Sequence, residues 1–269
     1  MNTRKFTISI LREARADEKR TPFTPDQVKI LIANFPNIKI LVQPSKKRCF
    51  KDEEYSKAGA KLDEDIINSN IIFGIKEVDI SKIIEGKTYL FFSHTSKVPN
   101  ENVQNSQDQS IIYKKNLLRK VSKKNVTLID YENIRDKSKK AYRYLGFGRF
   151  AGIVGCYNTL NLYLKLNKKK LLPRAFEINS YEKIKKLISK QNFNKLKILQ
   201  TGIGNVAKGS MEILKHANIK QISLKDYLDK KYDEPVYCNI STREHIERKD
   251  GKDFSHQDFT LNPHEYKSK

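Results

Sequence analysis

Short runs of apolar residues recur through the first half of the chain, and stretches that fit helices separate them. The runs cover residues 5–11, 38–42, 71–75, 88–92 and 126–129. Continuous apolar runs of this kind are typical of parallel strands that are buried on both faces of a sheet. The pattern therefore predicts a parallel α/β lobe that ends near residue 135.

The stretches between these runs carry signals for helix ends. Thr24 and Pro25 provide an N-cap and a first-turn proline for a helix through Asn34. Three acidic residues at 52–54 open a shorter helix that stops near Gly59, and a further helix is expected over roughly residues 107–120. Strands and helices thus alternate, as in a sheet covered by helices.

The second half of the chain repeats this organisation after a charged turn at residues 135–140. Residues 147–166 predict a long helix whose small residues permit close packing, and residues 180–191 predict an amphipathic helix. A strand over residues 195–200 then leads directly into a glycine turn. We therefore expect an α/β fold with two Rossmann-like lobes, residues 1–135 and 136–269, each with a parallel sheet.

The charge of the chain is strongly positive, with 53 basic and 31 acidic residues and a formal net charge of +22. The lysines are scattered instead of forming one stripe with interleaved aromatic residues, so a nucleic-acid partner is not expected. An apolar content of 38%, with 13 Phe and 13 Tyr, argues for a folded protein. The positive charge is interpreted as a compositional bias with some attraction for anionic substrates.

Cysteine usage and hydropathy favour a cytoplasmic protein. Cys49, Cys156 and Cys238 are widely spaced and form no CxxC pattern, so neither a disulfide framework nor a metal site is expected. The N-terminus lacks the apolar stretch of a secretion signal. The longest membrane-span candidate, residues 145–166, is interrupted by Arg149 and two asparagines, so no membrane insertion is expected.

The sharpest motif is Thr-Gly-Ile-Gly-Asn-Val-Ala at residues 201–207, between a predicted strand and a predicted helix. It matches the G-x-G-x-x-G/A form of dinucleotide-binding turns. Gly202 would make the tight turn, Gly204 would admit a pyrophosphate, and Ala207 would allow close packing. The helix N-terminus at Asn205 and Val206 would face the phosphates. The alternative is a glycine turn without a ligand.

The choice between NAD and NADP stays open. The acidic residue that usually binds the ribose follows the motif by about 20 residues, at the end of the second strand. Here residues 219–223 offer only Ser223, and Asp226 comes a few residues late. Lys220 or Lys225 could favour a 2′-phosphate.

A second group of candidate residues comes just after two predicted strands. Lys76 and Glu77 follow one strand, and His94 follows the next. Ligands of open α/β sheets bind at the carboxyl ends of the strands. If the two strands are near neighbours, a lysine and a histidine would face one cleft, where desolvation can bring a lysine into the acid/base range.

Each of these residues also has a structural explanation. Lys76 could be a solvated strand end, and His94 could cap a helix or bond within a loop. Further cations at neighbouring loops, namely Arg15, Arg20 and Lys97, favour a functional interpretation instead. Such a set suits a substrate with several carboxylates, because arginine binds a carboxylate with two parallel hydrogen bonds.

Seven stretches, in their order along the chain, resemble one known family. They are LREARADEKRTPFTP (11–25), FKDEEYSKAGA (50–60), IIFGIKEV (71–78), KTYLFFSHT (87–95), TLIDYE (127–132), FGRFAGIVG (147–155) and TGIGNVAKG (201–209). The chain resembles the saccharopine dehydrogenases that form L-lysine, including the lysine-2-oxoglutarate reductase part of the bifunctional lysine-degrading enzyme. Alanine dehydrogenase and the nucleotide-binding subunit of transhydrogenase share the two-lobed architecture and several of these elements.

The resemblance implies a reaction and roles for particular residues. Hydride would move between NAD or NADP and the carbon of an imine or secondary amine that joins lysine to 2-oxoglutarate in saccharopine. Lys76 and His94 match the catalytic lysine and histidine of the family, and Glu77 would tune the lysine. The positions expected to hold substrate carboxylates are Arg15, Arg20, Lys97 and Arg143.

The C-terminal part departs from the family pattern. Residues 250–254 and 262–266 resemble a segment that lies within the family's chains, with further strands still to come. We therefore expect a second sheet that is incomplete at its C-terminus. Two alternatives to saccharopine dehydrogenation follow: an alanine dehydrogenase-like oxidoreductase, and a truncated remnant that binds a nucleotide without turnover.

Overall fold

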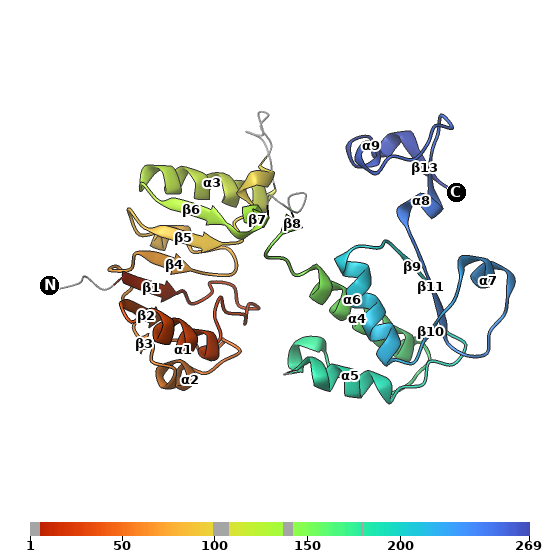
Figure 1. Cartoon of the computed structure of the whole chain (residues 1–269), viewed down its shortest axis with the longest axis horizontal. Helices are drawn as coiled ribbons and strands as arrows, with labels where there is room; N and C mark the ends of the chain where they lie inside the picture. Colours follow the sequence, from red (N-terminus) through yellow and green to blue (C-terminus); the bar gives the residue numbers. More distant parts are fainter. Residues whose placement is uncertain (1–5, 99–107, 137–141, 179) are drawn as a thin grey trace. The chain divides into compact units, whose positions relative to one another are not determined.

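The computed structural model describes residues 6–98, 108–136, 142–178 and 180–269 (Figure 1). The chain divides into two compact units, Met1–Leu145 and Gly146–Lys269, and each is considered by itself below.

The first unit contains a six-stranded sheet in which every neighbouring pair of strands is parallel. Its strands are β1 (Phe6–Ile10), β2 (Ile38–Val42), β3 (Lys61–Leu62), β4 (Ile71–Phe73), β5 (Thr88–Phe91) and β6 (Thr127–Asp130). The order across the sheet is β3-β2-β1-β4-β5-β6 (Figure 1). The chain therefore moves outward from β1 in one direction and then from β4 in the other, which makes β1 and β4 the topological switch point.

Helices cover both faces of this sheet, as the apolar runs predict. Along β2, Ile40 and Val42 join one buried cluster while Leu41 joins another, because successive side chains of a strand point to opposite faces. The first cluster includes residues of α1 (Pro25–Asn34) and α2 (Asp52–Lys57), and the second includes Leu117 of α3 (Gln109–Lys123). The predicted cap is present: the Thr24 side chain accepts a hydrogen bond from the Gln27 amide at the start of α1.

Short elements complete the first unit around the sheet. They are the 3₁₀ turns η1 (Ile80–Lys82), η2 (Thr95–Lys97) and η4 (Tyr131–Asn133) and the antiparallel pair β7 (Arg135–Asp136) and β8 (Tyr142–Arg143). Because β8 belongs to the first unit, Arg143 lies in the same unit as Lys76 and His94.

The second unit contains a three-stranded parallel sheet with the order β10-β11-β9. In chain order its elements are α4 (Gly148–Leu166), α5 (Tyr181–Ser189), β9 (Lys197–Thr201), α6 (Asn205–His216), β10 (Lys220–Gln221), α7 (Leu224–Asp229) and β11 (Val236–Ile240). The chain continues through α8 (Thr242–His245), β12 (Ile246–Arg248), α9 (His256–Leu261) and β13 (Tyr266–Ser268), and β12 and β13 pair antiparallel.

The second strand of this unit differs from the sequence prediction. A strand was expected over residues 219–223, but β10 is only two residues long and both of its side chains are exposed. The apolar strand β11, which is almost wholly buried, lies between β10 and β9 instead. The reason is burial, because the central strand of a parallel sheet is covered on both faces and must be apolar.

Helices α4 and α6 pack together at two glycines, which confirms the predicted close helix packing (Figure 1). A Cβ atom added at Gly152 would lie 1.8 Å from the Val206 carbonyl oxygen, and one added at Gly209 would lie 1.9 Å from the Arg149 carbonyl oxygen. Such distances leave no space for any side chain. The Arg149 guanidinium also donates two hydrogen bonds of 2.6 Å to Glu212, which ties the two helices across this contact.

No helix in the described part of the chain combines the length and the apolar character needed to cross a membrane.

Candidate active site

The loops that follow β1 and β4 are joined by the carboxylate of Glu13. Glu13 Oε1 accepts a hydrogen bond of 2.7 Å from the Ile75 amide, and its Oε2 accepts one of 2.9 Å from the Lys76 amide. Burial raises the pKa of Glu13 despite these two bonds, which act in the opposite direction. Glu13 thus fixes the backbone of Lys76 at the switch point, where open α/β sheets bind their ligands.

Lys76 itself is half-buried at this switch point. Its ammonium group makes no hydrogen bond or ion pair with any residue that the structure describes. Its positive charge is one of the influences that lower the pKa of the nearby Glu18, where hydrogen bonds from Arg20 outweigh the effect of burial. The ammonium group of Lys76 is therefore close to carboxylates but forms an ion pair with none of those that the structure describes.

The two predicted arginines after β1 are each held by a neighbouring carboxylate. Arg15 donates to both oxygens of Asp17 at 3.0 and 2.8 Å, and Arg20 donates to both oxygens of Glu18 at 2.8 and 2.5 Å. Arg15 also lies 3.8 Å from Glu77, measured from Nη1 to Oε2. The loop after β1 therefore carries two oriented guanidinium groups and the loop after β4 carries Glu77 beside one of them.

His94 follows β5 and has a backbone conformation that is unusual for a residue with a side chain. Its φ of 54° and ψ of 20° lie in the left-handed region. Such strain persists only where the surroundings enforce it, and it is common at functional sites. The imidazole stacks on the Phe92 ring with the centroids 6.2 Å apart. The Phe92 amide donates a hydrogen bond of 3.1 Å to the Ile75 carbonyl oxygen, which ties the His94 loop to the Lys76 loop.

Three of the predicted residues converge on one carboxylate that the sequence analysis did not select. Glu132 Oε2 lies 3.0 Å from His94 Nδ1, and Glu132 Oε1 lies 3.0 Å from Lys97 Nζ and 3.3 Å from an Arg143 guanidinium nitrogen. Burial alone would raise the pKa of Glu132, but its interactions with His94 and Lys97 outweigh burial and lower it to about 2. Glu132 is thus ionised at neutral pH. Its Oε1 accepts hydrogen bonds from Lys97 and Arg143, while the His94 ring lies beside Oε2 without a hydrogen bond.

The loops after β5 and β6 are fastened together by a second carboxylate. The buried Asp130 accepts a hydrogen bond of 2.7 Å from the Ser93 hydroxyl and one of 2.8 Å from the Glu132 amide. Ser93 precedes His94 directly. Asp130 therefore fixes the backbone on either side of the contact between His94 and Glu132.

The sequence contained a signal for Glu13 and Glu132, although it was not used. Glu13 lies two residues past the predicted strand 5–11, and Glu132 lies three past the strand 126–129. Both are therefore at the ligand-binding edge of a parallel sheet. What the pattern did not reveal is that β1 pairs with β4 and β5 with β6, which brings these carboxylates to Lys76 and His94.

The glycine turn of the second unit has the features of a phosphate-binding turn. Gly202 has a φ of +94°, which suits glycine, and donates a hydrogen bond of 2.7 Å to the Ile240 carbonyl oxygen. Gly204 is the N-cap of α6 and provides no capping side chain. Among the described residues, none accepts a hydrogen bond from the amides of Asn205, Val206 and Ala207. A helix N-terminus with free amides attracts anions.

The two glycines of this turn face open space. A Cβ atom added at Gly202 or Gly204 would meet no other atom within 4 Å, so the turn opens onto free space. Val206, in the first turn of α6, is 56% exposed. The residues present are therefore compatible with a bound pyrophosphate.

Ser223 is not brought to this turn. Its side chain accepts a hydrogen bond of 3.0 Å from the Asp226 amide and caps α7. It follows β10, and β11 separates β10 from β9 and the glycine turn. Lys220 pairs with Glu234 at 3.1 Å. The described residues thus offer no evident ribose partner at the end of β10.

The part of the chain that the structure describes contains no group of three His, Cys, Asp or Glu side chains placed to hold a metal ion.

Comparisons with known proteins agree with this architecture. Residues 9–153 match the family model described as alanine dehydrogenase/PNT, N-terminal domain. The chain is 31% identical to the mitochondrial alpha-aminoadipic semialdehyde synthase of Bos taurus over 277 residues, which cover 92% of this chain and 28% of that protein. The Arabidopsis thaliana alpha-aminoadipic semialdehyde synthase is 29% identical over 290 residues, covering 93% of this chain and 26% of the relative. This chain therefore spans less than a third of these relatives.

Solved structures show the same fold at low sequence identity. An L-alanine dehydrogenase superposes with a TM-score of 0.54 and 13% identity, covering 87% of this chain and 60% of that chain. A transhydrogenase from Sinorhizobium meliloti superposes with a TM-score of 0.53 and 11% identity, covering 81% and 58% of the two chains.

Proposed function

The chain belongs to the alanine dehydrogenase/PNT N-terminal domain family. On this basis we propose that it acts as an NAD(P)-dependent saccharopine dehydrogenase of the L-lysine-forming type. The observation that carries the proposal is the placement of Lys76 and His94 in the loops that follow the adjacent strands β4 and β5, with cations near His94. The similarity to alpha-aminoadipic semialdehyde synthases supports a role in lysine metabolism, within the broader class of amino-acid oxidoreductases.

The cations suit a substrate with several carboxylates. Saccharopine carries three carboxylates and one secondary amine, whereas alanine and pyruvate carry one carboxylate each. Arg15, Arg20, Lys97 and Arg143 supply four positive groups within one unit. Their present partners are carboxylates of the protein itself, so a substrate carboxylate would exchange with or join an existing ion pair.

The contact with Glu132 suggests which nitrogen of His94 acts. Oε2 of the ionised Glu132 lies 3.0 Å from Nδ1 without a hydrogen bond in this conformation, and a small rotation of the ring would let Nδ1–H donate to it, which favours the tautomer with its proton on Nδ1. Lys97 Nζ is farther from Nδ1, at 3.4 Å. Nε2 then has a free lone pair and serves as the base toward the substrate. Glu132 would stabilise the imidazolium that forms when Nε2 accepts a proton.

Lys76 and His94 would divide the proton transfers. A nicotinamide nucleotide, when bound, accepts the hydride from the carbon beside the secondary amine. One of the two side chains takes the proton of that amine, and the other activates the water that attacks the resulting imine of the substrate. Collapse of the adduct releases lysine and 2-oxoglutarate. Glu13 keeps the Lys76 backbone in place throughout.

The glycine turn of the second unit would hold the nucleotide. Gly202 and Gly204 leave room for the pyrophosphate, and the amides of residues 205–207 would donate to its oxygens. The assay decides between NAD and NADP, because β10 is followed by Ser223 and not by an acidic residue.

The test follows the absorbance of NADH or NADPH with the purified chain. Saccharopine with NAD⁺ or NADP⁺, and lysine plus 2-oxoglutarate with the reduced nucleotides, are compared with pyruvate plus ammonia. Turnover that requires saccharopine, or both lysine and 2-oxoglutarate, supports the proposal. Turnover with pyruvate and ammonia instead would assign an alanine dehydrogenase.

Calorimetric binding of saccharopine provides a second readout that does not depend on turnover. We expect Arg15→Ala and Lys97→Ala each to weaken binding, since each removes a cation from the site. Unchanged binding by both variants would contradict the role of these cations.

A further inference from the structure

A buried arginine lies in the first unit, in the segment between β2 and α2. The side chain of Arg48 is only 3% exposed. Burial lowers the pKa of its guanidinium group. A buried cation is costly unless its donors are satisfied, and apolar residues of similar size often serve stability equally well. An arginine at this place therefore calls for an explanation other than stability.

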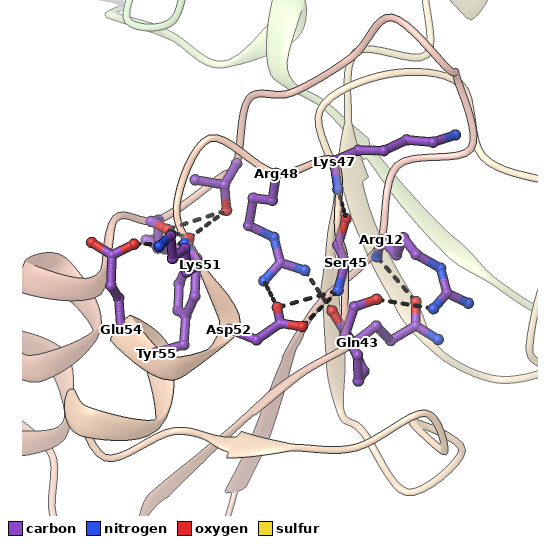
Figure 2. A network of polar contacts seen from close by, with 12 residues as sticks. Arg12, Gln43, Ser45, Lys47, Arg48, Lys51, Asp52, Glu54 and Tyr55 are labelled. Atoms are coloured by element: carbon purple, nitrogen blue, oxygen red, sulfur yellow. Dashed lines mark hydrogen bonds and ion pairs between the residues drawn. The ribbon is translucent and has the colours of Figure 1, made fainter. Parts of the chain in front are cut away.

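The hydrogen bonds of Arg48 fasten the loop after β2 to the start of α2. Its guanidinium group donates to the Gln43 carbonyl oxygen and, at 3.4 Å, to Asp52 Oδ1. Asp52 Oδ2 also accepts a hydrogen bond of 3.0 Å from the Ser45 amide. Figure 2 shows Arg48 directed at Asp52, with Tyr55 beside it. Residues 43–52 thus form one network around a single guanidinium group.

Tyr55 of α2 connects this network to the loop after β1. Arg48 Cζ lies 4.9 Å from the centroid of the Tyr55 ring, a favourable contact between a cation and an aromatic face. Tyr55 has no exposed surface. Its hydroxyl donates a hydrogen bond of 2.7 Å to the Phe23 carbonyl oxygen and lies 3.0 Å from Thr21 Oγ1. The loop after β1 is therefore tied to the ring that Arg48 holds.

The backbone is held on both sides of Arg20. Directly before it, the Lys19 carbonyl oxygen accepts a hydrogen bond of 2.8 Å from the amide of Cys49, the residue after Arg48. The carbonyl oxygen three residues after Arg20 is the one that accepts from the Tyr55 hydroxyl. Two segments that meet at Arg48 thus fix the backbone from which the Arg20 side chain extends.

We propose that Arg48 and Tyr55 are positioning residues for substrate binding, which hold the backbone on both sides of Arg20 so that its guanidinium group meets a substrate carboxylate. The inference rests on the proposed function, which assigns Arg20 to a substrate carboxylate. Neither Arg48 nor Tyr55 touches the substrate, since both side chains are buried. Their loss should weaken binding and spare the proton transfers, because other contacts hold the loops of Lys76 and His94.

The first variant is Tyr55→Phe, which removes the hydroxyl and keeps the ring beside Arg48. With saccharopine varied at saturating nucleotide, KM should rise about two- to tenfold, as for the loss of one hydrogen bond, while kcat changes less than about twofold. Tyr89→Phe is the matched control, because Tyr89 is also buried in the first unit and its hydroxyl accepts a hydrogen bond of 3.0 Å from the Ile84 amide. The control should keep the KM of the parent chain. An equal rise in both variants would overturn the proposal.

A double variant tests whether the effect passes through Arg20. Arg20→Ala removes the anchor itself, so adding Tyr55→Phe to it should raise KM no further. Additive effects would show that Tyr55 acts on binding by another route, and would overturn the proposal. Arg48→Lys keeps the charge but loses the planar fork, and Arg48→Met loses both, so KM should rise more in Arg48→Met. A parental KM in Arg48→Met would contradict the role of Arg48.

Hydrogen exchange provides a readout that needs no substrate. The Cys49 amide should exchange about two- to tenfold faster in Tyr55→Phe than in the parent chain and stay protected in Tyr89→Phe, because its hydrogen bond to Lys19 depends on the same network. Unchanged exchange in Tyr55→Phe would contradict the coupling. Absence of saccharopine turnover by the parent chain would contradict the proposed function. Turnover by the parent with an unchanged KM in Tyr55→Phe would overturn the positioning role alone.

Discussion

At the carboxyl edge of the first sheet, charged side chains hold one another in place, whereas the glycine turn of the second sheet offers backbone amides that have no partner among the residues the structure describes. Glu132 engages His94, Lys97 and Arg143 together, and Glu13 binds the Lys76 amide. At the turn, Gly202 and Gly204 face open space, and the first amides of α6 are free.

This difference indicates which kind of substitution impairs each region. In the first unit the geometry depends on side chains, so the loss of one functional group changes chemistry while the sheet persists. In the second unit the geometry depends on how closely the helix backbones approach each other. An added methyl group should therefore destabilise this unit more than the loss of a functional group. Substitutions of the two kinds therefore separate the contributions of the two units.

The largest effect is expected from Lys76→Met, which keeps the length of the side chain but removes its acid/base group. Turnover of saccharopine should fall by about 10²- to 10⁴-fold, the usual range for general acid–base catalysis. NADH binding should stay unchanged, because the glycine turn lies in the other unit. Steady-state kinetics and nucleotide fluorescence measure the two quantities. Lys57→Met on α2, an exposed lysine, is the control, and comparable activity in both variants would exclude a catalytic role for Lys76.

A methyl group at the crossing of α4 and α6 should give the next largest effect. Gly152→Ala places a Cβ atom 1.8 Å from the Val206 carbonyl oxygen, so the helices must separate. We expect a loss of about 1–3 kcal/mol in the free energy of unfolding, measured by urea denaturation. Gly155→Ala on the same helix meets no atom within 4 Å and should stabilise by about 0.5–1 kcal/mol through helix propensity. Equal destabilisation by both variants would contradict the close approach.

A carboxylate at the start of α6 tests the free amides. Val206→Asp should weaken NADH binding by about tenfold. The added carboxylate repels the phosphates, and it can accept hydrogen bonds from the backbone amides in the first turn of α6 that would otherwise bind them. The stability of the unit should not decrease, since an acid in the first turn favours the helix. Leu228→Asp on α7 is the control, as Leu228 is 70% exposed and away from the turn. If Val206→Asp binds NADH as the parent chain does, the phosphates do not lie at this helix.

The smallest effect concerns acid stability. The pKa of Glu132 in the folded protein is about 2, below its ordinary value of 4.5. The contribution of Glu132 to stability is therefore fully present above about pH 4.5 and is lost as the pH falls toward 2. Solvent screens the half-exposed Lys97 and Arg143, so we expect a contribution on the order of 1 kcal/mol.

The matching variant is Glu132→Gln, which keeps the shape but not the charge. Urea denaturation between pH 6 and pH 3 should show a shallower loss of stability in this variant than in the parent chain. Parallel pH profiles for the two proteins would contradict the ion-pair role of Glu132.

Local patterns in the sequence predicted the elements well. The apolar runs marked the five longest strands of the first unit. The N-cap at Thr24 and the helix α6 were also predicted, because each is encoded by residues that are close together in the sequence. The positions of Lys76 and His94 just after strands also followed from these patterns. Burial and capping act over a few residues, so a single sequence encodes them directly.

Contacts between distant segments could not be read in this way. Nothing near residue 13 shows that its carboxylate binds the amides of Ile75 and Lys76, and nothing near residue 94 shows that Glu132 lies beside it. Both contacts depend on which strands pair and in which register. The same limit explains Ser223, since only the folded sheet places β11 between β10 and β9.

The sequence by itself thus determined the class of fold, the glycine turn and the kinds of chemical group at each strand end. The tertiary structure alone decided which of these groups meet: Glu13 with the Lys76 loop, and Glu132 with His94, Lys97 and Arg143. The physical reason is that local preferences are satisfied within a few residues. Strand order is instead decided by how the apolar faces of the whole unit are buried together.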